Sequence, residues 1–140
     1  MKILLAVDGS SGSLSAARHV ARLSREGLAA EVIVVHVQAP LLVVELLLSP
    51  DEEKLSRLTQ EKGRRAVEPA CAVLRDAGVP HRVEIASGEP APRILELAAE
   101  TGADLIVVGA RGLGAVKGLL LGSVSGAVMQ LAPVPVTAAK

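Results

Sequence analysis

The 140-residue chain contains no phenylalanine, tyrosine or tryptophan, although half of its residues are hydrophobic. Proteins usually hold single-stranded nucleic acid by stacking its bases on aromatic rings, so this kind of binding is excluded. Lysine and arginine number 15, aspartate and glutamate also number 15, and the net charge is zero. This balance indicates neither nucleic acid nor an anionic membrane as a partner. Any base that the protein binds must lie against aliphatic side chains.

Cysteine is almost absent as well. The single cysteine, Cys71, cannot form a disulfide within the chain, which favours a reducing compartment and predicts a cytoplasmic protein. The apolar start at residues 3–7 is too short for a signal peptide and meets Asp8 at once. The run at residues 41–48 is broken by Glu45 and is far shorter than the roughly 20 residues that span a bilayer. We therefore expect no targeting signal and no membrane span.

Short apolar runs alternate along the chain with longer stretches that have helical spacing. The length predicts one domain, residues 1–140. Strands are expected at residues 2–7, 31–37, 82–86, 104–108 and 134–139. Helices are expected at residues 13–25, 51–77, 90–101 and 124–131. This alternation predicts an α/β fold with a five-stranded parallel sheet, doubly wound, with helices on both faces.

Ligands of such sheets bind beyond the carboxyl ends of the strands, where the strand order reverses. The loop after the fourth strand, residues 109–118, is rich in glycine and leads to Gly122 and Ser123 at a helix start. Glycine lets a backbone approach phosphate closely, and a helix start offers free N–H donors. Neither the Walker loop nor the dinucleotide fingerprint fits the spacing. Glycine content alone therefore does not distinguish a phosphate site from a flexible loop that precedes an ordinary serine-capped helix.

Simple energetics show that one helix end is not enough for a nucleotide. A helix N-terminus contributes about 0.3–1 kcal/mol to the binding of an anion. Micromolar affinity requires roughly 8 kcal/mol, so several donors must converge. The candidates are the N–H groups of Gly109, Gly112 and Gly122, the hydroxyls of Ser123 and Ser125, and the guanidinium of Arg111.

The glycine spacing resembles a known signature. Gly109, two residues, Gly112, nine residues and Gly122–Ser123 are similar to the nucleotide motif of the universal stress protein family, in its ATP-binding branch. The opening ILLAVDGS at residues 3–10, His36 with Val37, and PVPV at residues 133–136 match as well. The resemblance covers the whole chain. It implies strand order 3-2-1-4-5, a homodimer joined through the fifth strand, and a stress-response regulator that acts as an ATP-binding switch.

The resemblance also implies which residues contact the base and the ribose. Ala6 and Val37 would border adenine, and the backbone of Val37 would pair with the base. Asp8 would face the ribose or a Mg²⁺ ion bound to the nucleotide.

The phosphates would lie along the second glycine-rich part of the chain. The resemblance implies that Gly109, Arg111 and Gly112 follow the ribose and phosphates. It implies that the phosphate tail is held through N–H and hydroxyl groups of Gly122, Ser123, Val124 and Ser125.

Other interpretations remain open for several of these residues. Asp8 could simply cap the turn at residues 10–12. His36 has no second histidine or cysteine at metal-ligand spacing, which favours a partly buried, hydrogen-bonded histidine over a ligand. Residues 41–48 could form a lid over the base, a partner surface or a disordered loop.

Two other functions are compatible with the same motif. One is a slow ATPase or nucleotide-dependent transferase, and the other is a dimerisation module with an empty pocket. The three glycines and Ser123 disfavour the empty pocket. The sequence shows no nucleophile–base pair, so we predict no catalytic residue and at most weak hydrolysis.

Two prolines near the end of the chain bear on the predicted dimer. If the even-numbered residues of 134–138 pair with the fourth strand, Pro133 and Pro135 face outward without N–H donors. We then expect a short ladder between subunits, confined to about Thr137 and Ala139. Side chains, with residues 41–48 as candidates, would supply most of the contact area.

Overall fold

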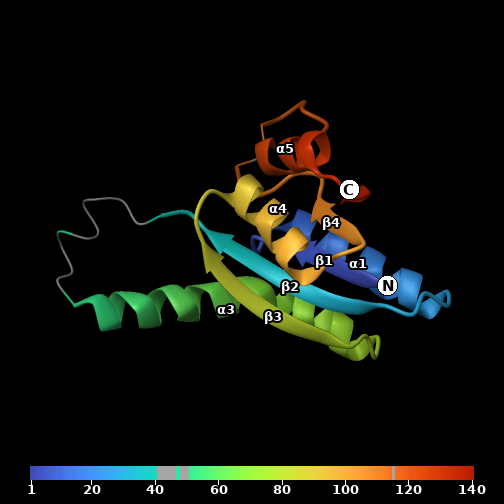
Figure 1. Ribbon diagram of the computed structural model, residues 1–140, viewed down its shortest axis with the longest axis horizontal. Coiled ribbons are helices and arrows are strands. Elements are labelled where there is room, and N and C mark those ends of the chain that lie inside the picture. The colour runs from blue at the N-terminus through green and yellow to red at the C-terminus, as the bar shows by residue number, and fades with distance from the viewer. Residues whose placement is uncertain (41–46, 48–50, 115) are drawn as a thin grey trace.

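The computed structural model describes residues 1–40, 47, 51–114 and 116–140, which form a parallel sheet flanked by helices (Figure 1). The elements are β1 (Lys2–Ala6), α1 (Ser11–Arg25), β2 (Glu31–Gln38), α3 (Glu52–Asp76), β3 (His81–Ser87), α4 (Pro90–Thr101), β4 (Leu105–Gly109), α5 (Ser123–Leu131) and β5 (Val136–Ala139). The predicted α/β class is confirmed, with each expected strand and helix present. The predictions for residues 41–48 fall outside the described residues, apart from Leu47.

The strand order is β3-β2-β1-β4-β5, as the family resemblance implies. β1 lies between β2 and β4, and Leu4 is opposite Ile33 on one side and Ile106 on the other. The chain thus builds the sheet outward in one direction and then in the other. The carboxyl ends of β1 and β4 meet at this reversal, which is where open α/β sheets bind ligands.

The sheet separates two hydrophobic cores. Ile3 and Leu5 point to the face that α1 and α3 cover, whereas Leu4 and Ala6 point to the face that α4 and α5 cover (Figure 1). Because both faces are buried, β1 is a continuous apolar run rather than an alternating one.

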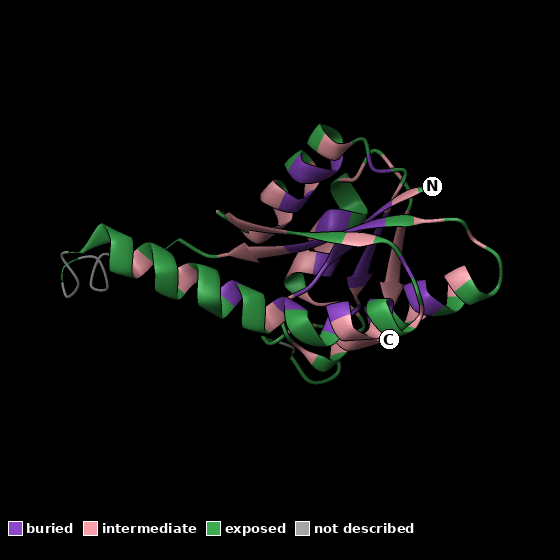
Figure 2. Cartoon of the chain, turned by 90° about the horizontal axis from the view of Figure 1, so that it is seen from below, coloured by how far each residue is buried: buried purple, intermediate pink, exposed green. Residues whose placement is uncertain are grey.

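Helix α3 begins well outside the sheet. Its first turns are exposed or half-buried, and burial begins at Gly63 (Figure 2). The side chain of Asp51 accepts hydrogen bonds from the N–H groups of Glu53 and Lys54, which satisfies donors that the helix itself leaves free.

The register of β5 shows that the predicted direction of its prolines was wrong. The N–H of Ile106 donates to the carbonyl of Pro135 at 3.0 Å, and the N–H of Ala110 donates to the carbonyl of Ala139 at 2.7 Å. Odd-numbered residues of β5 therefore face β4, and the N–H and C=O groups of Val136 and Ala138 face the outer edge. A shift of one residue reverses every backbone group of a strand, and the sequence does not show which register is taken. Thr137 and Ala139 consequently cannot form the predicted ladder between subunits.

Candidate functional site

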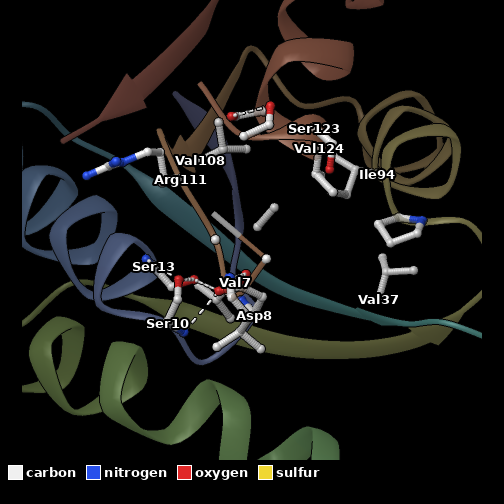
Figure 3. A pocket seen from close by; sticks show the side chains of 18 of the residues that line it. Val7, Asp8, Ser10, Ser13, Val37, Ile94, Val108, Arg111, Ser123 and Val124 are labelled. Atoms are coloured by element: carbon white, nitrogen blue, oxygen red, sulfur yellow. Dashed lines mark hydrogen bonds between the residues drawn. The ribbon is translucent and has the colours of Figure 1, made fainter. Parts of the chain in front are cut away.

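A cavity of about 200 Å³ opens at the carboxyl edge of the sheet, beside the N-terminal ends of α1, α4 and α5 (Figure 3). All ten residues selected from the sequence line it: Ala6, Asp8, Val37, Gly109, Arg111, Gly112, Gly122, Ser123, Val124 and Ser125. The fold therefore brings them together from β1, the loop after β1, β2, β4, the loop after β4 and the start of α5. Their contact with a nucleotide remains a prediction.

One side of the cavity is aliphatic. Its side chains come from three strands and two helices: Ala6, Val35, Val37, Val108, Pro90, Ile94 and Val124 (Figure 3). A slot of this kind accepts a flat, mostly apolar ring by burying its faces. The absence of aromatic residues means that these aliphatic groups are what such a ring would contact.

The backbone of Val37 faces the space beyond the end of β1. The N–H of Val7 donates to the carbonyl of Val35, and the N–H of Gly88 donates to the carbonyl of Gln38, each at 2.9 Å. Backbone groups alternate in direction, so odd-numbered residues of β2 face β1 and even-numbered residues face β3. Val37 therefore points one donor and one acceptor past Ala6, where β1 has ended.

His36 ties the ends of β1 and β2 together. Its Nδ1 lies 2.8 Å from the carbonyl oxygen of Val7, which can only accept, so Nδ1 carries the proton. The side chain is half-buried. The prediction that His36 is partly buried and hydrogen-bonded is confirmed.

The carboxylate of Asp8 lies at the opposite side of the cavity, at the start of α1 (Figure 3). Its Oδ1 accepts hydrogen bonds from the N–H of Ser10 at 2.9 Å and from the hydroxyl of Ser13 at 2.7 Å. Its Oδ2 accepts from the N–H of Leu113 at 3.1 Å. Burial acts to raise the pKa of Asp8, but the bonds from Ser10, Ser13 and Leu113 together lower it below its ordinary value.

Two glycines of the motif pack closely against the loop after β1 and the start of α1. A Cβ at Gly109 would lie 2.7 Å from the carbonyl oxygen of Gly12, at the start of α1. A Cβ at Gly112 would overlap Oδ2 of Asp8. The glycine spacing points to phosphate, and the structure adds a packing role: a side chain at Gly109 would meet backbone, and one at Gly112 would have to displace the end of the Asp8 side chain.

The start of α5 uses some of its expected donors internally. The N–H of Gly122 and the hydroxyl of Ser125 both donate to the carbonyl of Ala110 at 2.7 Å. Both groups are thus hydrogen-bonded within the protein in this structure, and their roles as phosphate donors stay a prediction. In contrast, no side-chain hydrogen bond caps α5, and its first turn presents the N–H groups of Ser123, Val124 and Ser125.

The sequence profile of the universal stress protein family matches residues 1–140. The chain belongs to the universal stress protein family. It is 40% identical over 135 residues to a universal stress protein of Thermus aquaticus, with 96% of this chain and 94% of that one covered. Two solved structures resemble it over their lengths. Hypothetical protein MJ0577 is 30% identical with a TM-score of 0.82, covering 99% of this chain and 94% of that one. A universal stress protein in complex with cAMP is 27% identical with a TM-score of 0.65, and the match covers 100% of this chain and 96% of that one.

The described residues contain no group of three or more histidine, cysteine, aspartate or glutamate side chains that could hold a metal ion. Asp8 lines the cavity, and its carboxylate accepts three hydrogen bonds, two at Oδ1 and one at Oδ2. No helix in the described part of the chain is long and apolar enough to cross a membrane.

Sequence reasoning missed two groups of lining residues in this member of the family. Ser10 and Ser13 follow Asp8 closely, so the hydrogen bonds of the carboxylate could have been anticipated from DGSSGS. Val35, Ile94 and Val108 carried no signal, because an aliphatic residue in a strand or helix predicts core packing whether or not it borders a cavity.

Proposed function

We propose that this universal stress protein binds an adenine nucleotide, ATP in the cell, in the cavity at the carboxyl edge of its sheet. The protein would act as a regulatory binding protein in the stress response rather than as an enzyme. The observation that carries the proposal is the pairing, in one cavity, of an aliphatic slot with an uncapped helix start. These two features suit the two ends of a nucleotide.

The base would occupy the aliphatic slot. Val35, Val37 and Ile94 border it, and the backbone of Val37 offers one donor and one acceptor at its edge. The edge of adenine likewise carries an amino donor beside ring acceptors, so the two can pair in plane. The relative that was solved with cAMP supports this assignment at 27% identity, since cAMP contains the same base.

The phosphates would lie at the start of α5. The N–H groups of Ser123, Val124 and Ser125 converge there with the exposed hydroxyl of Ser123. A helix start carries partial positive charge in addition to its free donors, which favours a phosphate group. Arg111 also lines the cavity, and its guanidinium, which points away from the cavity in Figure 3, would have to turn inward to meet a phosphate.

The geometry favours binding over catalysis. Among the described residues that line the cavity, Asp8 is the only carboxylate. Hydrogen bonds lower its pKa and occupy both oxygens, which makes it a weak general base. We therefore expect ATP to be held with at most slow hydrolysis.

The test begins with protein purified gently and freed of nucleic acid. The chain has no tryptophan or tyrosine, so a strong ultraviolet absorption band would come from bound nucleotide, which mass spectrometry can identify. Calorimetric titration with AMP and with ATP then measures affinity. Protein that carries no nucleotide and binds neither compound at millimolar concentration would contradict the proposal and favour the dimerisation module. Rapid release of phosphate from ATP would favour the enzyme.

We further propose that the protein is a homodimer joined through β5. Val136 and Ala138 direct their N–H and C=O groups to the outer edge of the sheet, where a second β5 could pair antiparallel. Ala138→Pro removes one outward N–H and leaves the bonds to β4 in place. Sedimentation should show a dimer for the wild type and a 14.3-kDa monomer for this variant. A wild-type monomer at micromolar concentration would contradict the proposal.

A further inference from the structure

Asp8 joins two segments that lie far apart in the sequence. Through Oδ1 it holds the start of α1, at Ser10 and Ser13. Through Oδ2 it holds the N–H of Leu113, which is 105 positions further along the chain. One half-buried carboxylate thus connects the loop after β1 to the loop after β4.

The loop after β4 is anchored at its two ends by other bonds. Ala110 donates to Ala139 and accepts from Gly122, which closes the base of the loop. In the described part of this loop, the bond from Leu113 to Asp8 is the hydrogen bond that ties its middle to the rest of the protein. Gly112 packs against the same oxygen so closely that a Cβ there would overlap it.

We propose that Asp8 is a positioning residue, which holds residues 111–114 in the shape that forms the phosphate end of the cavity, and that it does not act as a ligand for a metal ion. This inference rests on the proposed nucleotide function, because the held residues Arg111, Gly112, Leu113 and Gly114 line that cavity. Without the bond, the middle of the loop loses its tether, and the cavity loses one wall.

Asp8→Asn is the direct test. The amide of asparagine has one oxygen. It can accept the hydrogen bonds from Ser10 and Ser13 only if its NH₂ group faces the N–H of Leu113. Two donors then face each other, and the tether is lost. Without nucleotide, hydrogen exchange of the Leu113 amide, followed by NMR, should accelerate roughly tenfold or more. Affinity for AMP with a chelator present should fall roughly tenfold or more, and affinity for ATP should fall by the same factor with and without Mg²⁺.

Asp51→Asn is the matched control. Asp51 accepts two backbone hydrogen bonds at the start of α3, so the chemical change is the same, but Asp51 does not line the cavity. This variant should leave both the exchange of Leu113 and the affinity for AMP within twofold of the wild type. Protection of the buried Cys71 thiol from a thiol reagent shows that each variant is folded.

Gly112→Ala disturbs the contact between the loop and Asp8 through a change in the loop itself. Its methyl group would displace Oδ2 of Asp8 or the loop, while both oxygens and the charge remain. Like Asp8→Asn, it should accelerate hydrogen exchange of the Leu113 amide and lower the affinity for AMP. This second variant decides the question if Asp8→Asn fails to fold.

The outcomes separate this inference from the proposed function. Unchanged exchange of Leu113 in both variants would overturn the positioning role, whatever the wild type binds. A loss of affinity that occurs only when Mg²⁺ is present would also overturn it, because Asp8 would then act through the metal. A wild type that binds neither AMP nor ATP would refute the nucleotide function, and the exchange result would still decide whether Asp8 holds the loop.

Discussion

Two helices, α1 and α5, begin at the same cavity, and their first turns are built differently. At α1 the hydroxyl of Ser10 accepts the N–H of Ser13 at 3.2 Å, and Asp8 accepts the N–H of Ser10. At α5 the preceding residue is Gly122, which has no side chain, and no side-chain hydrogen bond caps the helix.

The difference shows which helix start can receive an anion. A helix start attracts negative charge, and at α1 the carboxylate of Asp8 already supplies it. A phosphate placed there would be repelled by Asp8, and the N–H of Ser13 is already bonded to Ser10. At α5 neither obstacle is present, so of these two helix starts the uncapped one suits a phosphate.

Ser123→Asp would make the start of α5 resemble that of α1 and has the largest expected effect. The new carboxylate would repel phosphate and occupy N–H groups of the first turn, so affinity for AMP should fall by about 10- to 100-fold. The same charge should stabilise the helix by about 0.3–1 kcal/mol. Calorimetry measures the affinity, and urea denaturation measures the free energy of unfolding.

Two variants complete that experiment. Ser123→Ala should weaken binding by only about 0.5–1.5 kcal/mol, because the backbone donors remain. Gly126→Ala adds a methyl group that meets nothing within 4 Å and should stabilise α5 by about 0.5–1 kcal/mol. Gly126 does not line the cavity, so the affinity of that variant should not change. Equal affinity of Ser123→Asp and the wild type would refute α5 as the phosphate site.

Ser10→Ala removes the cap of α1 and has a smaller expected effect. The N–H of Ser13 loses its acceptor, so the free energy of unfolding should fall by about 1 kcal/mol. Ser11→Ala is the matched control, because Ser11 is an exposed neighbour in the first turn of the same helix. Its effect in urea denaturation should stay within about 0.5 kcal/mol. Equal effects of the two substitutions would show that the cap contributes nothing.

Acid should weaken the start of α1, with the smallest expected effect. The pKa of Asp8 is lower in the folded state than in the unfolded chain, so its stabilisation is complete above the unfolded pKa. It is lost as the pH falls through the folded pKa, which lies below about 4. The difference in unfolding free energy between wild type and Asp8→Asn should therefore be constant near neutral pH and shrink as the pH falls below about 4. A difference that persists unchanged down to the acid unfolding of the protein would contradict this role of the charge.

Much of the candidate site could be predicted because its residues are unusual in type or spacing. Gly109, Gly112 and Gly122 with Ser123 stand out in any sequence, and Asp8 is conspicuous after five apolar residues. The aliphatic wall could not be found in this way. Val35 and Ile94 have the residue types of the core, and only the packing of α4 beside the end of β2 places them at the cavity.

The sequence by itself determined the α/β class. Strands and helices space their apolar residues differently, and local backbone geometry sets each spacing. Only the tertiary structure decided which backbone groups are free. The carbonyl of Ala110 accepts hydrogen bonds from the N–H of Gly122 and the hydroxyl of Ser125, and the carboxylate of Asp8 accepts one from the N–H of Leu113. The N–H and C=O groups of the odd-numbered residues of β5 face β4 rather than the outer edge of the sheet. A hydrogen bond between distant segments depends on register and close approach, and neither has a signature in the order of the residues.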